Sequence, residues 1–240
     1  MRIDVYLYNS GLVSSRTEAK RFIDEGAVTV NGTTVKKASF DVDGSEDISV
    51  DKTVKEFVSR GGIKLKGALM QFGIDVKDRM CLDVGASSGG FTDCLLQFGA
   101  KHVTAVDSGS GQLAESIKQD VRVTSLENYN ARYMKREDFE YAPDLAVMDV
   151  SFISATYIIP AIFDVLSDDG EFVCLIKPQF EVGRSGLGKG GIVKDSKVRD
   201  IAVKKVLDFA QSVGFEVKGI VQSSIKGGDG NIEFLAHFVK

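Results

Sequence analysis

The chain has 240 residues, 43% of them hydrophobic, which is enough to bury the core of one medium-sized domain and one small domain. A formal net charge of -4 excludes a protein coated in positive charge, so any contact with nucleic acid must come from local patches. No apolar run reaches the length of a membrane span, and the three cysteines lack the paired spacing of a disulfide framework or a metal site. We therefore expect a cytoplasmic protein that contacts neither a metal nor a membrane.

The sequence pattern of residues 1–54 predicts a small α+β domain. Apolar residues recur at helical spacing ahead of Gly26, which predicts a helix capped by Ser14 or Ser15. Short β-prone runs follow between residues 27 and 50, and the Asn-Gly pair after the first run is typical of a hairpin turn.

Basic residues gather along that predicted helix. Arg16, Lys20 and Arg21 fall at positions i, i+4 and i+5, and Arg2 is available nearby. Such a group could contact RNA phosphates, but the solvated face of an ordinary helix would have the same pattern. The spacing alone leaves both interpretations open.

Residues 55–58 predict a short linker, and residues 59–240 then alternate between helical and strand patterns. The predicted helices cover residues 63–72, 91–98, 112–118, 156–166 and 197–213. The predicted strands cover residues 80–84, 102–106, 121–124, 145–150, 171–176, 215–222 and 232–239. Alternating strands and helices form a mostly parallel sheet, and the closing hairpin makes one of the seven strands antiparallel. The predicted fold class is α/β, with a Rossmann-like, doubly wound second domain.

A glycine-rich turn follows the first of these strands, within residues 81–92. Gly85 permits a sharp turn, and Gly89 and Gly90 remove side chains where a ligand and the start of the next helix approach the backbone. Asp107 ends the next strand about 20 residues further on, where a carboxylate can accept hydrogen bonds from ribose hydroxyls. This pattern predicts a nucleoside cofactor.

The spacing of the glycines narrows the choice of cofactor. Dinucleotide sites usually have the pattern G-x-G-x-x-G, which aims a helix N-terminus at a pyrophosphate, whereas this turn has the pattern G-x-x-x-G-G. The difference favours S-adenosylmethionine, which has an amino-acid end and a sulfonium but no phosphate. The residues expected to bind it are Asp83, Gly85, Ser87, Gly89, Gly90, Phe91, Asp107, Asn128, Asn130 and Asp149. The two asparagines could equally be turn residues.

Four charged residues from distant parts of the sequence are predicted to meet at one rim of the sheet. Asp149 lies at the end of the fourth strand, and Lys177 immediately follows the fifth. Glu233 starts the antiparallel last strand, and Lys64 belongs to the helix before the first strand. The group could be a network of rim salt bridges, or it could promote methyl transfer to a hydroxyl. In the second interpretation Lys177 acts as a base or as a stabilising ammonium and Asp149 holds it, while Lys64 and Glu233 orient a ribose and balance charge.

Other chemistries of methyl transfer use residues that this chain lacks at the expected positions. Phe152 follows the fourth strand without the Pro-Pro pair typical of amine methylation, and it is either a core aromatic or a stacking residue. Cys81 and Cys174 fall inside predicted strands, where neither suits a nucleophile for methylation at carbon.

Further basic residues lie close to the predicted site. Residues 179–195 contain five glycines as well as Arg184 and Lys189. They predict either a surface loop or a lid that closes over RNA. Arg60, just ahead of the second domain's first helix, is another candidate for RNA contact.

The N-terminal residues resemble a known RNA-binding domain. The runs at residues 2–7, 15–23 and 26–32 closely resemble the ribosomal-protein S4-type domain. The resemblance covers about the first 50 residues and implies that the basic residues named above contact RNA.

The rest of the chain resembles a family of RNA methyltransferases. Lys64, Asp149, Lys177 and Glu233 fall where the Lys-Asp-Lys-Glu tetrad lies in FtsJ-type ribose 2′-O-methyltransferases. The S4-like domain ahead of them, together with the runs at residues 59–65, 111–113 and 177–181, looks like the TlyA, or hemolysin-A-like, family.

The resemblance implies a function and a set of partners. It implies S-adenosylmethionine-dependent 2′-O-methylation of cytidine, with ribosomal RNA or ribosomal subunits as partners. We separately expect the protein to be a monomer or a weak homo-oligomer. The alternatives are a secreted or membrane-active hemolysin and an RNA-binding ribosome assembly factor without catalysis.

Overall fold

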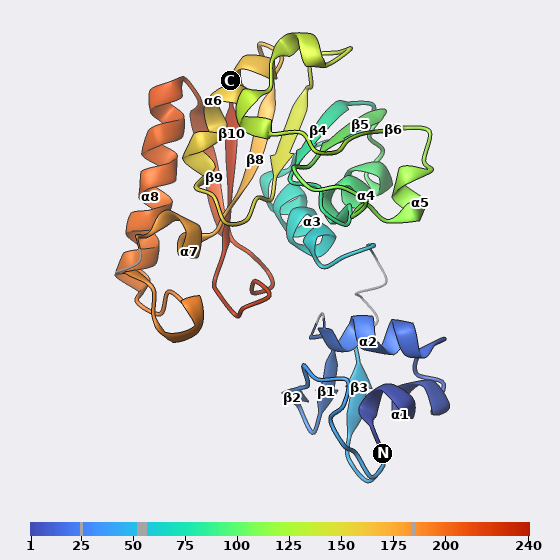
Figure 1. The fold of residues 1–240 in the computed structure, drawn as a ribbon. Coiled ribbons are helices and arrows are strands. Elements are labelled where there is room, and N and C mark those ends of the chain that lie inside the picture. The colour runs from blue at the N-terminus through green and yellow to red at the C-terminus, as the bar shows by residue number, and fades with distance from the viewer. Residues whose placement is uncertain (25, 52–56, 184–185) are drawn as a thin grey trace. The chain divides into compact units, whose positions relative to one another are not determined.

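The computed structural model describes residues 1–24, 26–51, 57–183 and 186–240, and the chain divides into two compact units, residues 1–56 and 57–240 (Figure 1). Each unit has its own hydrophobic core. No helix in these ranges is long and apolar enough to cross a membrane.

The N-terminal unit packs two helices, α1 (Ile3–Asn9) and α2 (Arg16–Asp24), with a small sheet. Its strands are β1 (Val28–Val30), β2 (Thr33–Thr34) and β3 (Ile48–Val50), in the antiparallel order β2-β1-β3. Helix α2 is the predicted helix, and Ser15 accepts a hydrogen bond from the Glu18 N–H at its start. Helix α1 was not predicted, because it has only seven residues and no side-chain cap.

The C-terminal unit is built on the predicted seven-stranded sheet, in the order β6-β5-β4-β7-β8-β10-β9. Its strands are β4 (Met80–Val84), β5 (His102–Val106), β6 (Val123–Leu126), β7 (Leu145–Met148), β8 (Glu171–Ile176), β9 (Glu216–Gln222) and β10 (Phe234–Val239). Strand β10 runs antiparallel to both β8 and β9, and the pairs that link β4 to β8 and β4 to β6 are parallel. The α/β fold class with one antiparallel strand is thus confirmed.

Helices cover both faces of this sheet (Figure 1). On one face lie α3 (Gly61–Phe72), α4 (Gly90–Gln97) and α5 (Glu115–Lys118), whose apolar residues pack with Cys81 and Val103. On the other lie α6 (Ile159–Val165) and α8 (Ser196–Val213), which pack with Leu82 and Val84. Successive side chains of β4 thus pack against helices on opposite faces of the sheet, as expected for a strand that is buried on both faces.

Several predicted bounds are wrong by a few residues. Strand β6 starts two residues late, because Val121 is 96% exposed and pairing with β5 begins at Val123. The predicted strand 145–150 ends at Met148, and the helix predicted at 112–118 begins only at Glu115. The helix predicted at 156–166 is divided into the 3-10 turn η4 (Ala155–Tyr157) and α6, which has a proline in its first turn.

Candidate active site

The glycine turn after β4 brings the ends of two strands into contact. Gly85 has a φ of +84°, and a Cβ there would lie 2.5 Å from the carbonyl oxygen of Asp149. The Asp149 N–H in turn donates to the Val84 carbonyl at 2.9 Å. Only glycine permits this approach, which sets Asp149 directly beside the turn.

At the next two glycines, other segments of the chain approach the backbone closely. A Cβ at Gly90 would lie 2.1 Å from the Ser59 Oγ, and one at Gly89 would lie 2.8 Å from Leu113. Helix α3 therefore begins against the N-terminus of α4, and this contact positions Lys64, four residues into α3. Gly90 also lines a small pocket, and contact of Gly89 and Gly90 with a cofactor stays a prediction.

Asp107 lies at the rim of a pocket of about 410 Å³. Its carboxylate accepts hydrogen bonds from the N–H groups of Ser87 and Gly109, both at 2.7 Å. Asn130 also lines this pocket, whereas Asn128 is an exposed turn residue with a φ of +54° that is absent from the lining.

A second, smaller pocket of about 170 Å³ adjoins the first. The two share Gly85, Ser87, Asp149 and Ser151. The smaller pocket is also lined by Lys64, Lys177, Ser59, Ser88 and Phe91. Together they form one site at the carboxyl ends of the parallel strands, where ligands of open α/β sheets bind.

Asp83 lies fully buried beneath this turn. Its Oδ2 accepts a hydrogen bond from the Thr92 hydroxyl at 2.6 Å, while its Oδ1 has no partner within the described residues. Burial, with smaller contributions from the nearby carboxylates of Asp149 and Asp107, raises the pKa of Asp83 to about 7. A buried carboxylate oxygen without a donor suits the amino group of an amino-acid cofactor such as S-adenosylmethionine.

The four predicted tetrad residues form two ion pairs. Lys177 Nζ lies 2.5 Å from the Asp149 carboxylate and 2.7 Å from the Ser151 Oγ. Lys64 Nζ lies 2.6 Å from the Glu233 carboxylate, and both of these side chains are at most 10% exposed. Lys64, Asp149 and Lys177 line the smaller pocket, while Glu233 lies behind Lys64.

Strand register explains how these distant residues meet. Phe234 pairs with Ile176 across the antiparallel β8–β10 ladder, so Glu233 and Lys177 are next to each other at the same end. The parallel β7–β8 ladder brings Asp149 to that end as well. Lys64 completes the group because its own helix begins against α4.

An aromatic pair lies beside Lys177. Phe152 is 92% exposed and has a φ of +64°, a strained conformation for a bulky residue that costs about 1–3 kcal/mol. Its ring lies 5.2 Å from that of Phe180, and Lys177 Nζ lies 5.9 Å from the centre of the Phe180 ring. The core interpretation of Phe152 is therefore wrong.

A second exposed aromatic group borders the larger pocket and was missed in the sequence. The Arg132 guanidinium lies 5.1 Å from the ring centre of Tyr157 and 5.8 Å from that of Tyr133. Both tyrosines are more than half exposed. Tyr157 comes from η4 and the other two residues from η2 (Ala131–Tyr133), so no sequence spacing could have indicated the contact.

The basic residues predicted to contact RNA have varied surroundings. Arg2 and Arg16 each bind the buried carboxylate of Asp4 at 2.9 Å, and Lys20 is exposed. Arg60 donates to the Lys226 carbonyl at 3.0 Å. Arg184 and the side chains of Arg21 and Lys189 lie outside the described residues. Their roles in RNA binding stay predictions.

The glycine-rich segment from residue 179 onward contains two short helices, α7 (Pro178–Glu181) and η6 (Lys189–Gly191). Beyond them the Val193 N–H donates to Asn231 Oδ1 at 3.0 Å, which ties the segment to the loop before β10. Closure over RNA stays a prediction.

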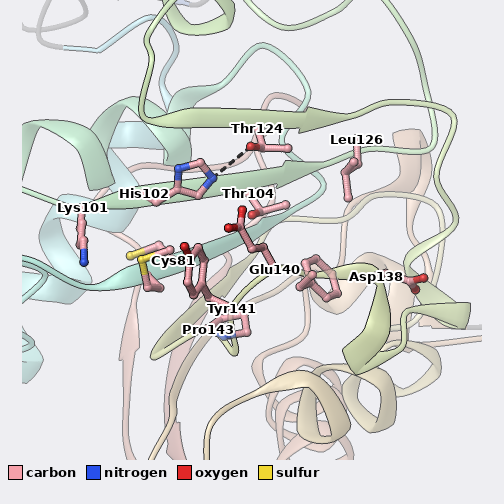
Figure 2. A pocket seen from close by; sticks show the side chains of 12 residues that line it. Cys81, Lys101, His102, Thr104, Thr124, Leu126, Asp138, Glu140, Tyr141 and Pro143 are labelled. Carbon is pink, nitrogen blue, oxygen red and sulfur yellow. Dashed lines mark hydrogen bonds between the residues drawn. The ribbon is translucent and has the colours of Figure 1, made fainter.

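Another pocket lies away from this site (Figure 2). It begins at Met80 and His102, where β4 and β5 start, and His102 contacts the Thr124 hydroxyl at 3.1 Å. Because ligands of doubly wound sheets bind at the opposite ends of the strands, it is not the expected cofactor site.

Two observations concern the cysteines and the possible metal ligands. Burial raises the pKa of the Cys81 thiol to about 12, which disfavours a thiolate nucleophile there. Residues 1–24, 26–51, 57–183 and 186–240 contain no group of three or more His, Cys, Asp or Glu side chains placed to hold a metal ion.

The doubly wound sheet, the glycine turn and the carboxylate after β5 define a Rossmann-like methyltransferase. Residues 57–240 match the FtsJ-like methyltransferase family, and residues 1–48 match the S4 domain. The chain belongs to the FtsJ-like methyltransferase family, and its cofactor is S-adenosylmethionine.

Similar proteins extend the match over the whole chain. Hemolysin A of Brachyspira hyodysenteriae is 44% identical over 240 residues, covering 100% of both chains. The 16S/23S rRNA (cytidine-2′-O)-methyltransferase TlyA of Mycobacterium tuberculosis is 43% identical, covering 97% of this chain and 87% of its own. A solved structure from Streptococcus thermophilus is 46% identical with a TM-score of 0.80, covering 100% of this chain and 88% of that one.

Proposed function

We propose that this chain transfers a methyl group to the ribose 2′-hydroxyl of a cytidine in ribosomal RNA. Its membership of the FtsJ-like methyltransferase family and its 43% identity to a relative named as an rRNA (cytidine-2′-O)-methyltransferase support the reaction. The S4 domain supports an RNA substrate.

The observation that carries the proposal is the placement of two lysines in one small pocket beside the cofactor turn. Lys64 and Lys177 line it with Asp149, and each ammonium is ion-paired. A ribose hydroxyl is a weak acid, so cations beside it favour alkoxide character as the bond to the methyl carbon forms. Rim salt bridges alone would not need to enclose a cavity.

Each tetrad residue has a role in this proposal. S-adenosylmethionine, when bound, supplies a methyl group on a sulfonium, which is a good leaving group. Lys177 assists loss of the proton from the hydroxyl, and Asp149 and Ser151 fix its Nζ. Lys64, fixed by Glu233, orients the ribose and balances the developing charge.

The exposed aromatic residues would hold the RNA. Phe152, paired with Phe180 beside Lys177, offers a face on which the target base can stack, and such stacking contributes about 1–3 kcal/mol. Arg132 between Tyr133 and Tyr157 offers a cation and two ring faces to the neighbouring nucleotides. We expect a ribosomal RNA substrate to place the protein in the cytoplasm, and a monomeric or weakly self-associating state stays a prediction.

Replacing Lys177 tests the proposal. Lys177→Ala should lower methyl transfer by about 1,000-fold or more, because it removes the group beside the reacting hydroxyl, as loss of an acid-base or electrostatic group commonly does. Cofactor affinity should stay within about threefold, since Asp83 and Asp107 are untouched. Transfer is measured with radiolabelled S-adenosylmethionine on ribosomal subunits from cells without this protein, and affinity by calorimetry.

Lys204→Ala is the matched control. Lys204 also forms an ion pair, 2.7 Å from Asp208, but it is 73% exposed on α8. Transfer by this variant should equal that of the wild type. A wild-type chain that methylates no ribose would overturn the proposal and favour a non-catalytic assembly factor or a membrane-active protein.

A further inference from the structure

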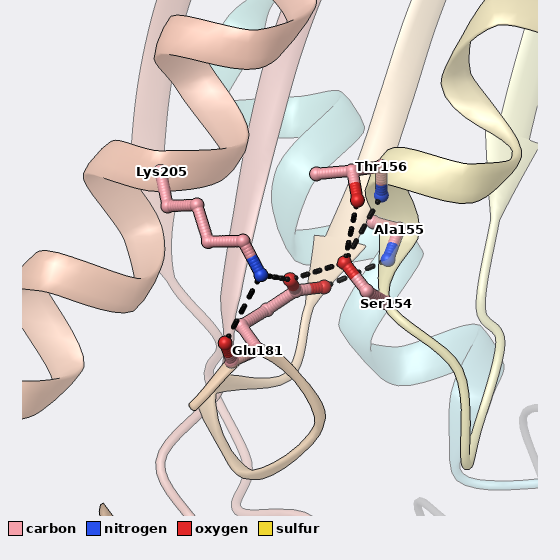
Figure 3. Close-up of polar contacts among 5 residues, drawn as sticks. All are labelled: Ser154, Ala155, Thr156, Glu181 and Lys205. Carbon is pink, nitrogen blue, oxygen red and sulfur yellow. Dashed lines mark hydrogen bonds and ion pairs between the residues drawn. The ribbon is translucent and has the colours of Figure 1, made fainter. Parts of the chain in front are cut away.

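A buried carboxylate outside the tetrad joins three separate segments of the C-terminal unit. The Glu181 side chain, 2% exposed, accepts hydrogen bonds from the Ser154 hydroxyl at 2.6 Å and from the Ala155 N–H at 2.7 Å (Figure 3). Lys205 of α8 donates to the same carboxylate at 3.2 Å and to the Glu181 carbonyl at 3.1 Å.

The segments joined are those that carry the Lys177–Asp149 ion pair. Helix α7 begins directly after Lys177 and ends at Glu181. The connection from β7 to η4 begins at Asp149 and ends at Ser154, the residue that Glu181 binds. The Lys177–Asp149 ion pair thus joins the two segments where they begin, and the Glu181 carboxylate joins them where they end.

The loop that Glu181 closes is under strain. Phe152 has a φ of +64° and is 92% exposed, so packing of its own ring into a core does not stabilise that conformation. A strained backbone persists only where its surroundings fix it. Polar contacts that hold this loop include the Asp149 N–H donating to Val84, the Ser151 Oγ accepting from Lys177, and the Glu181 carboxylate at its end. The Asp149–Lys177 ion pair, the ring contact of Phe152 with Phe180 and the packing of Val150 and Ile153 against the core also contribute.

We propose that Glu181 is a positioning residue, which keeps residues 149–155 in the strained conformation that presents Phe152 and Ser151 to the RNA and to Lys177. The expected effect of Glu181 on methyl transfer rests on the proposed function. The expected effect of Glu181 on the conformation of the loop does not, because it follows from the contacts of Glu181 alone.

The test is Glu181→Gln in the full-length chain. The amide keeps the size of the side chain, but it has one oxygen where the carboxylate has two, so it can no longer accept the hydrogen bonds of Ser154 and Ala155 at separate oxygens. Amide hydrogen exchange at residues 150–156 should rise about tenfold or more, as expected for a loop that opens locally. Single-turnover methyl transfer should fall about 10- to 100-fold, because misplacement of a reacting group by about 1 Å has that effect. Affinity for S-adenosylmethionine should change less than threefold.

Glu171→Gln provides the matched control. Glu171 starts β8, at the opposite end of the strand from Lys177, and its carboxylate also binds two groups, Arg79 at 2.5 Å and His237 at 2.6 Å. The same substitution there should lower the melting temperature while transfer per folded molecule stays within about threefold of the wild type. Equal losses of transfer in both variants would show that Glu181 only stabilises the fold.

A double substitution separates positioning from stability. If Glu181 acts through Phe152, Glu181→Gln should slow transfer less in a Phe152→Ala background than in the wild type. If the fold-loss of transfer in the double variant equals the product of the losses in the two single variants, Glu181 does not act through Phe152. Unchanged exchange at residues 150–156 in Glu181→Gln would overturn the positioning role whatever the activity. A wild-type chain inactive on ribose would overturn only the proposed function.

Discussion

Each unit of the chain contains a fully buried aspartate, and the two have opposite surroundings. In the N-terminal unit, Asp4 accepts hydrogen bonds from Arg2 and Arg16. Burial alone would raise the pKa of Asp4, but the two arginines outweigh it and lower the value to about 2. In the C-terminal unit, Asp83 is bound by the neutral Thr92 hydroxyl, and burial raises its pKa to about 7.

The difference is whether the protein itself supplies charged partners for the buried carboxylate. Arg2 and Arg16 balance the charge of Asp4 from inside the N-terminal unit, so their positive charge is only partly available to RNA. Asp83 has an oxygen with no partner within the described residues, beneath the glycine turn where we predict that the cofactor binds. We therefore expect Asp4 to support folding and Asp83 to support binding.

The largest expected effect comes from removing the N-terminal unit. A chain without residues 1–56 should bind ribosomal RNA about 100-fold more weakly, because it loses one of two linked binding modules. Its affinity for S-adenosylmethionine should not change, since the pocket residues all belong to the C-terminal unit. Filter binding and calorimetry measure the two affinities, and full-strength RNA binding by the shortened chain would refute the division of roles.

Substitution of Asp83 should have the next largest effect. Asp83→Asn should weaken S-adenosylmethionine binding about tenfold or more, the usual loss when a hydrogen bond to a charged group is removed. At pH 8 the same variant should unfold at a higher temperature than the wild type, because it no longer buries a carboxylate that tends to ionise. The control is Asp164→Asn on the exposed side of α6, and unchanged affinity in Asp83→Asn would remove Asp83 from the cofactor site.

The sequence was most informative for strands that are buried in the middle of the sheet and bounded by clear turn residues. The bounds of β4, β5 and β8 were predicted to the residue, because each is a short apolar run between turn residues and is buried on both faces of the sheet. Elements with few residues or exposed ends were harder to predict. Helix α1 was missed, and β6 was shifted by two residues.

Within the site, residues at strand ends could be predicted and residues brought in by loops could not. The positions of Asp149 and Lys177 follow from topology, because the carboxyl ends of parallel strands meet. The contact of Glu181 with Ser154 depends on the path of two loops, and the exposure of Phe152 depends on a left-handed backbone. Neither has a local pattern in the sequence.

Substitution of Asp4 should affect folding alone. Asp4→Asn should lower the melting temperature of the N-terminal unit by about 4–8 °C, as expected for a loss near 1 kcal/mol in a domain of this size. The amide can still accept one hydrogen bond from an arginine, which limits the loss. Affinity for S-adenosylmethionine should stay at the wild-type value. Asp41→Asn, an exposed position in the same unit, is the calorimetric control, and reduced cofactor affinity in Asp4→Asn would contradict the contrast.

The smallest effect, and the most direct comparison of the two carboxylates, is the pH dependence of stability. One titrating group changes the free energy of unfolding by at most about 1.4 kcal/mol per pH unit. The pKa of Asp83 is raised from 3.8 to about 7, so its contribution is fully present below pH 3.8 and is lost as the pH rises through 7. The pKa of Asp4 is lowered from 3.8 to about 2, so its contribution is present above pH 3.8 and is lost as the pH falls through 2.

Calorimetry between pH 4 and 8 separates the two contributions. The gain in melting temperature of Asp83→Asn over the wild type should widen as the pH rises through this range, because the folded wild type retains a proton that its unfolded chain has released. The loss in Asp4→Asn should stay nearly constant, because Asp4 is ionised in both states across most of the range. Parallel curves for Asp83→Asn and the wild type would show that Asp83 ionises as easily in the fold as in water, and the contrast between the two units would then fail.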